Sequence, residues 1–203
     1  MNTKTDPQTK NVSLEQRERR LEQKGTIIWF TGLSGAGKTT LSCLLEKKLF
    51  DEKFMVYVLD GDQVRLGLNK DLGYSSEDRR ENIRRIGEVA KLFADGAFLV
   101  IVAFISPFRV DRDHVRQAMD PGRFIEVFVD CPLKICAERD TKGLYKKAMN
   151  NEIPDFTGIS SPYEPPLSPE IHLHTNTESI EGCVDSIHEY LKNNGAISVN
   201  NAP

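Results

Sequence analysis

The sequence has few of the features that would direct it to a membrane, to the cell exterior or to a polyanion. No run of about 18 apolar residues occurs, and the N-terminal segment lacks the short apolar core of a signal peptide. The net charge of −3 and the pI near 5.9 supply no overall basic field that would hold nucleic acid. We therefore expect a soluble, cytoplasmic protein whose partners are neither membranes nor nucleic acids.

Cysteine is also scarce. The four cysteines are scattered without a CxxC pair, so free thiols are expected and no zinc site is indicated. Internal repeats and low-complexity segments are missing as well. With 203 residues and 39% hydrophobic content, the chain predicts one main domain, because two halves would each have a thin core.

Apolar segments alternate with helical patterns along the chain. A segment that alternates like an edge strand (171–177) and an amphipathic helix (179–191) come last. Four earlier segments are dense enough to be buried parallel strands: "TIIWFT" (26–31), "MVYVLD" (55–60), "AFLVIVAF" (97–104) and "FIEVFVD" (124–130). This order predicts an α/β fold, a doubly wound parallel sheet of about five strands flanked by helices. Ligands should bind beyond the C-terminal ends of the strands.

The stretch "GLSGAGKT" matches the pattern G-x-x-x-x-G-K-T without a gap. Its glycines let backbone N–H groups close around phosphate oxygens at a helix N-terminus. Lys38 is expected to meet the β- and γ-phosphates of ATP, and Thr39 to bind Mg²⁺. A structural glycine turn is the alternative, but the strand before the loop and the amphipathic helix after it are the context that this motif requires. The predicted ATP-binding residues are Gly32, Leu33, Ser34, Gly35, Ala36, Gly37, Lys38 and Thr39.

Two carboxylates, Asp60 and Asp62, follow the second predicted strand in "LDGDQVR". One could hold Mg²⁺ through water, a role we assign to Asp60, and the other could take the proton of an acceptor hydroxyl. An ordinary turn around Gly61 is the alternative, since aspartates beside a glycine suit a tight bend.

Arginines near the same edge predict that the acceptor carries negative charge. The helical pattern of 74–97 places Arg79 and Asn82 on the extension of its apolar stripe, toward the cleft. Arg65 comes from the preceding turn, and arginine suits planar, bidentate contacts with anions. In "FISPFR", Ser106 stands where many P-loop enzymes have an acidic residue. Its hydroxyl could form a hydrogen bond with the transferring phosphate or an acceptor group, or could itself accept the phosphate. Alternatively, Ser106 is a serine before proline that only terminates the strand.

A long segment rich in lysine and then proline predicts a lid at about 139–165. Lys142 could screen phosphate charge there, and Phe156 offers a flat face for a base. The predicted organisation is a polar tail with a short charged helix over 1–24, a P-loop kinase domain over 25–195 and a loose tail over 196–203. The N-terminal helix should start at a capping box of Ser13 and Gln16 and stop at Gly25.

From about Gly25 to the final helix, the chain closely resembles adenylylsulfate kinases. The strings that carry the resemblance are "DGDQVRLGLNKDLGYSSEDRRENIRRIGEVAKLFADGA", "FISPFR" and "KGLYKKA...DFTGI.SPYE". The resemblance implies transfer of the γ-phosphate of MgATP to the ribose 3′-hydroxyl of adenosine 5′-phosphosulfate. The product would be 3′-phosphoadenylyl sulfate, the activated sulfate of assimilation.

The resemblance also implies roles for individual residues. Tyr74, where many relatives have Phe, and Phe156 would sandwich the acceptor's adenine, and Asp62 would be the base. Other residues would contact the phosphosulfate and ribose or line their pocket: Arg65, Arg79, Asn82, Ile105, Ser106 and Lys142. A phosphoserine intermediate on Ser106 has been considered for the family, but direct in-line transfer needs none and is favoured here. Enzymes of this kind are often homodimers, so a homodimer is expected.

Two other functions stay open at this point. A different small-molecule P-loop kinase would keep the phosphate loop but would not need Arg65, Arg79 and Phe156 together. A nucleotide-binding regulatory module without catalysis would not need Lys38, Thr39 and Asp62 intact.

Overall fold

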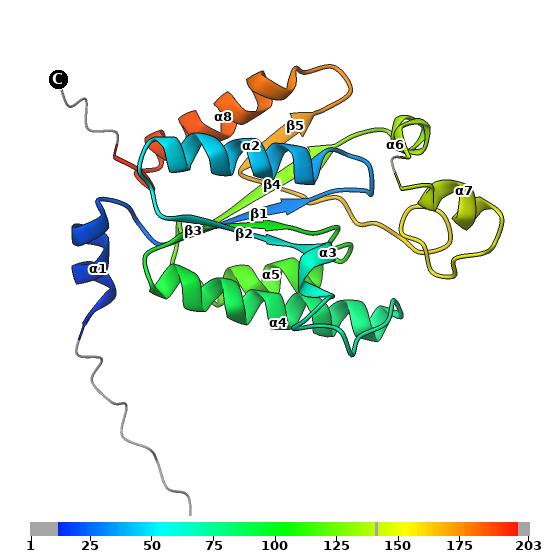
Figure 1. The fold of residues 1–203 in the computed structure, drawn as a ribbon, viewed down its shortest axis with the longest axis horizontal. Helices are drawn as coiled ribbons and strands as arrows, with labels where there is room; N and C mark the ends of the chain where they lie inside the picture. The colour runs from blue at the N-terminus through cyan, green and yellow to red at the C-terminus, as the bar shows by residue number, and fades with distance from the viewer. Residues whose placement is uncertain (1–11, 141, 199–203) are drawn as a thin grey trace, which may run out of the picture.

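The computed structural model describes residues 12–140 and 142–198. Its centre is one sheet of parallel strands in the order β2-β3-β1-β4-β5 (Figure 1). The strands are β1 (Thr26–Thr31), β2 (Val56–Asp60), β3 (Leu99–Ala103), β4 (Phe124–Asp130) and β5 (Ile171–His174). The predicted doubly wound parallel arrangement is confirmed, with the reversal of strand order beside β1.

Helices cover both faces of this sheet (Figure 1): α2 (Lys38–Asp51) and α8 (Ile180–Asn193) on one, and α4 (Ser76–Asp95) and α5 (Arg109–Gln117) on the other. The shorter helices are α1 (Leu14–Leu21), α3 (Gly61–Val64), α6 (Leu133–Arg139) and α7 (Leu144–Met149). Alternate side chains of β1 point to opposite faces, so Ile28 and Phe30 join one apolar cluster and Ile27 and Trp29 the other. Two buried cores therefore hold the central strand rigidly beneath the phosphate loop.

Burial of the second strand differs from the prediction. Tyr57 is 47% exposed, and Leu59 is the one buried residue of β2. The reason is strand order, because β2 lies at the edge of the sheet rather than inside it. The alternating segment at 171–177 does form the opposite edge strand, β5, in which Ile171 and Leu173 are buried.

The ends of the described chain pack near the N-terminal ends of the strands. The Ser13–Gln16 capping box forms as predicted, but α1 ends at Leu21 with Glu22 in the left-handed conformation at φ 54°. Gly25 is not the stop; a Cβ there would lie 1.9 Å from the Ala94 carbonyl oxygen, so it is a site of close packing.

The prediction places the start of the loose C-terminal tail too early, at residue 196. Ala196 and Ile197 are buried, and Ile197 forms a bridge with Gln23. Gln23 in turn donates to the carbonyls of Met55 and Ala97. Residues 1–11 and 199–203, which hold the rest of both predicted tails, lie outside the described residues.

All four cysteines are free thiols, as predicted, and Cys43 alone is exposed. Within 12–140 and 142–198, no helix has the length and apolar character that a membrane crossing requires.

Candidate active site

The phosphate loop connects β1 to α2 at the C-terminal end of the sheet. Gly35 and Gly37 have φ of 75° and 108°, a region that side-chain-bearing residues rarely adopt. The ammonium of Lys38 donates to the carbonyls of Gly32 (2.9 Å) and Leu33 (2.7 Å). Burial lowers the pKa of Lys38 to about 8, so its charge is poorly solvated and suited to binding phosphate.

Thr39 and Asp60 supply the oxygen atoms expected around Mg²⁺. The Thr39 hydroxyl lies 3.3 Å from Asp60 Oδ2, while Asp60 Oδ1 accepts from the backbone N–H of Asp62 at 2.9 Å. The turn that the sequence left as an alternative is thus present, since Asp60 caps α3, and the same carboxylate also faces the phosphate loop. A hydroxyl and a carboxylate are hard oxygen donors, which fit Mg²⁺.

A cavity of about 930 Å³ opens beside the phosphate loop. Gly32 and Leu33, which were predicted to bind ATP, do not line it, and their carbonyls accept from Lys38. The other predicted site residues all line this one cavity: Ser34, Gly35, Ala36, Gly37, Lys38, Thr39, Asp60, Asp62, Arg65, Tyr74, Arg79, Asn82, Ile105, Ser106, Lys142 and Phe156. This volume lies at the upper end of the range found for small-molecule sites.

Two guanidinium groups make one wall of the cavity attractive to anions. Arg79 is half-buried, and burial followed by repulsion from Arg65 lowers the pKa of Arg79. Such a pair of like charges is stabilised by an anion placed between them. Arg65 also donates to the carbonyls of Leu72 and Gly73 at 3.1 and 3.0 Å, which orders the loop before α4.

The two aromatic rings predicted to stack on a base line the same cavity. Tyr74 is 61% exposed, and the Arg65 guanidinium stacks over its ring at 4.4 Å from the centroid. Phe156 is buried and packs edge-on against Tyr145, with ring centroids 5.0 Å apart. One free aromatic face and one firmly packed ring provide surfaces on which a base can stack.

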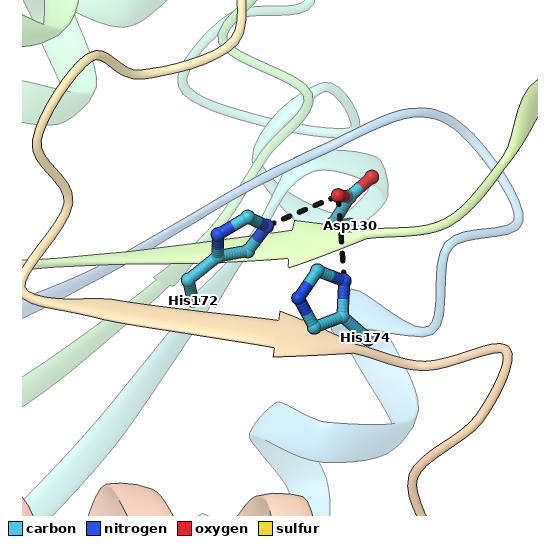
Figure 2. Close-up of side chains that lie close together, drawn as sticks. All are labelled: Asp130, His172 and His174. Atoms are coloured by element: carbon cyan, nitrogen blue, oxygen red, sulfur yellow. Dashed lines mark hydrogen bonds and ion pairs between the residues drawn. The ribbon is translucent and has the colours of Figure 1, made fainter.

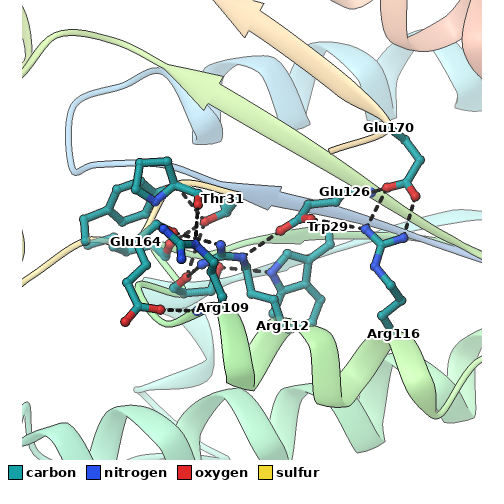
Figure 3. Close-up of polar contacts among 12 residues, drawn as sticks. Trp29, Thr31, Arg109, Arg112, Arg116, Glu126, Glu164 and Glu170 are labelled. Carbon is teal, nitrogen blue, oxygen red and sulfur yellow. Dashed lines mark hydrogen bonds and ion pairs between the residues drawn. The ribbon is translucent and has the colours of Figure 1, made fainter. Parts of the chain in front are cut away.

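Ser106 is held by a buried polar network that includes Trp29 and Arg112, both of which are labelled in Figure 3. It is 2% exposed and has φ of 39°, a strained value for serine. The indole N–H of Trp29 donates to its hydroxyl oxygen at 3.0 Å, and Arg112 donates to its carbonyl at 2.6 Å. Because the oxygen already accepts from Trp29, the Ser106 hydroxyl hydrogen is left to donate to a ligand.

Residues of the predicted lid contact Asp62 and Arg79 across the cavity. Lys142 forms an ion pair with Asp62, and both side chains are more than half exposed. Arg79 donates to the Thr157 hydroxyl at 2.7 Å and to the Asp155 carbonyl. The segment is therefore ordered against α4 through the residues expected to contact the acceptor.

Several residues that sequence reasoning missed position the predicted ones. Asn69 is buried and donates to the side-chain oxygen of Asn82 at 2.8 Å. The Tyr145 hydroxyl donates to the Ser34 carbonyl at 2.8 Å, and Arg139 donates to the carbonyls of Gly35 and Thr175. The segment "KGLYKKA" contained Tyr145, but no local pattern links any of these residues to partners so distant in the chain.

Strand order, the glycine-rich loop after β1 and the cavity beside it together define a P-loop kinase. A family model described as adenylylsulphate kinase matches residues 24–174. The chain belongs to the adenylylsulphate kinase family, and its function is that of an adenylyl-sulfate kinase, an ATP-dependent phosphotransferase of sulfate assimilation.

Named relatives support this assignment over most of the chain. It is 58% identical over 181 residues to a probable adenylyl-sulfate kinase of Halalkalibacterium halodurans, covering 89% of this chain and 90% of the relative. It is 52% identical to the adenylyl-sulfate kinase of Saccharomyces cerevisiae, covering 89% and 91%. The structure of the Mycobacterium tuberculosis APS kinase in complex with AMPPNP and APS matches with a TM-score of 0.79 and 45% identity, covering 84% of this chain and 99% of that one.

Proposed function

We propose that the cavity binds MgATP at the phosphate loop and adenylyl sulfate beside Arg65 and Arg79, and that the γ-phosphate passes directly to the ribose 3′-hydroxyl. The observation that carries this proposal is the meeting of the phosphate loop with the two arginines in one cavity. The M. tuberculosis relative supports it, since its structure is described with AMPPNP and APS together.

Each end of the cavity has a separate task in this proposal. Lys38 and the N–H groups of the loop bind the phosphates, while Thr39 and, through water, Asp60 hold Mg²⁺, which would neutralise charge on the transferring phosphate. Asn82 and Ile105 line the acceptor's pocket, and its adenine stacks between Tyr74 and Phe156.

Proton transfer needs only modest help in this reaction. Asp62 accepts the 3′-hydroxyl proton as the oxygen attacks, a role that loose phosphoryl transfer makes helpful rather than indispensable. Lys142, its ion-pair partner, then turns to the phosphates or the phosphosulfate. Ser106 donates a hydrogen bond to a ligand without being phosphorylated, because its oxygen is held by the Trp29 indole, a donor rather than a base.

The direct test is ADP release with MgATP and adenylyl sulfate, beside adenosine 5′-monophosphate and a blank without acceptor. We expect rapid ADP release only in the reaction that contains adenylyl sulfate. The nucleotide product of that reaction should be heavier than adenylyl sulfate by one phosphoryl group. Arg65→Ala should raise the KM for adenylyl sulfate and leave that for ATP nearly unchanged. Equal, slow ADP release in all three reactions would contradict the proposal and favour a regulatory nucleotide-binding module.

Two expectations stay predictions of the sequence and the family resemblance. They are a cytoplasmic location and a homodimer. Sedimentation at several protein concentrations would decide the second.

A further inference from the structure

Three potential metal ligands meet at an edge of the sheet, on residues that the proposed reaction does not use. Asp130 ends β4, and His172 and His174 are alternate residues of β5. The parallel register pairs Asp130 with His174 and Phe128 with His172, so all three ligand side chains project from the same face. Figure 2 shows both imidazole rings directed at the Asp130 carboxylate.

The spacing of the ligand atoms fits a small divalent ion. Asp130 Oδ2 lies 3.0 Å from His172 Nε2 and 3.6 Å from His174 Nδ1. All three ligand atoms lie within 4.8 Å of one another. On a tetrahedral zinc ion with bonds near 2.0–2.1 Å, neighbouring ligand atoms are about 3.3 Å apart. An ion would therefore enter with small rotations of the side chains.

The surroundings keep this cluster in place and open to solvent. The Phe128 ring stacks on His172 with centroids 4.8 Å apart, and the two imidazole centroids are 4.3 Å apart. The Thr175 N–H donates to the Asp130 carbonyl at 3.0 Å, which joins the ends of the two strands. The side chains of His172, His174 and Asp130 are 44%, 51% and 37% exposed, so water can complete the coordination of an ion.

We propose that Asp130, His172 and His174 form a binding site for a divalent transition-metal ion, with zinc as the best fit. Two imidazoles and one carboxylate suit Zn²⁺, Co²⁺ or Ni²⁺, whereas Mg²⁺ prefers oxygen ligands alone. The site is therefore distinct from the Thr39–Asp60 pair in ligand type. The scattered cysteines had indicated no zinc site, and this one uses none of them.

Zinc titration against a chromophoric chelator tests the proposal, on the untagged full-length chain in excess Mg²⁺. We expect one Zn²⁺ per chain and a loss of affinity above about 100-fold in His172→Ala and in His174→Ala, since altering even an outer-shell partner typically costs 10–100-fold. Co²⁺ should give a visible absorption band in the wild-type chain that both variants lack. His114→Ala, which removes an exposed histidine of α5, is the matched control and should bind zinc normally.

A second control addresses the exposed thiol of Cys43, because thiolates also bind zinc. Cys43→Ser should leave zinc binding unchanged. Equal zinc affinity in the wild-type chain and His174→Ala, or loss of binding in Cys43→Ser, would overturn the proposal. Kinase activity in MgATP without added zinc should persist in His172→Ala, so this test fails or succeeds independently of the proposed function.

Discussion

Two residues of the cavity are each held in a state that is unfavourable in isolation, one a buried charge and the other a strained backbone. Lys38 is the clearest case, because a buried ammonium is destabilised until an anion arrives. Ser106 is a second, since a serine with positive φ is retained only where surrounding contacts fix it. Each makes a prediction that a single substitution can test.

MgATP binding should become pH-dependent above the lowered pKa of Lys38, which is about 8. Below that pH the ammonium is already charged, whereas above it binding must take up a proton, so affinity should fall about fivefold from pH 8 to pH 9. Calorimetry in two buffers of different ionisation enthalpy would count the proton. Lys38→Arg, which stays charged, should bind without uptake, and equal uptake in both proteins would refute the assignment.

Removal of the Ser106 hydroxyl should weaken catalysis without abolishing it. One hydrogen bond to a charged ligand contributes about 1.5–3 kcal/mol, so kcat/KM should fall roughly 10- to 150-fold in Ser106→Ala. Ser106→Gly lacks the same hydroxyl but tolerates the positive φ, and it separates the hydroxyl from backbone strain. Intact mass after incubation with MgATP should show no phosphorylated chain; a phosphorylated Ser106 would argue for an intermediate.

At the scale of elements, the N-terminal part of α4 links the lid to the acceptor site. Arg79 bonds the Tyr74 carbonyl at 2.8 Å on its own side and Thr157 and Asp155 across the cavity. The Arg79 guanidinium thus orders both Tyr74 and the part of the predicted lid that contains Asp155 and Thr157. Closure of the lid and binding of the acceptor should be coupled through this side chain.

Thr157→Val should separate the contact of Arg79 with the lid from its proposed contact with the acceptor's anionic group. The variant keeps the shape of the side chain but removes one hydrogen bond from a charged donor, which contributes about 1.5–3 kcal/mol, so the KM for adenylyl sulfate should rise roughly 10- to 150-fold. Limited proteolysis should cut the segment 139–165 faster. Arg79→Ala should raise the KM further, because the proposed anion contact is lost as well. Equal effects of the two variants on KM would show that Arg79 serves only the lid.

At the scale of the molecule, one buried ion pair joins the sheet to the site. Arg112 of α5 contacts Glu126 of β4 at 2.7 Å, with side chains 1% and 6% exposed. Arg112 also donates to the carbonyls of Ser106 and Glu164, so it connects strand, helix and cavity (Figure 3). Glu126 is shared with Arg116, which binds Glu170 as well.

Arg112→Met should be strongly destabilising because it leaves the Glu126 carboxylate buried with fewer partners. Breaking such a pair costs about 3–5 kcal/mol, or roughly 10 °C in Tm for a chain of this size. Arg85→Met, which breaks surface pairs with Asp71 and Glu81, is the control and should lower Tm far less, because pairs between solvent-exposed charges are screened by water and salt. Thermal unfolding followed by circular dichroism measures both; similar losses would contradict the buried-pair argument.

The sequence by itself determined the phosphate loop, the order of strands and helices along the chain, and about half of the residues that line the cavity. The "GLSGAGKT" motif and the apolar patterns of β1, β3 and β4 are local, since they depend on neighbours within a few positions. The expectation that Arg65 and Arg79 line the site also followed from local position. Arg65 follows the end of a predicted strand, and Arg79 lies on the extension of the apolar stripe of a predicted helix. Their roles stay predictions.

Only the tertiary structure decided which distant residues meet. Asn69 meets Asn82 through the packing of the loop after α3 against α4. Trp29 with Ser106 and Asp130 with the two β5 histidines depend on strand order and register, which no local pattern encodes. The exposure of β2 has the same origin, because its composition suits a buried strand and its edge position overrides that preference. Periodicity shows which side of an element is apolar, whereas the neighbour on that side is determined by the packing of the whole chain.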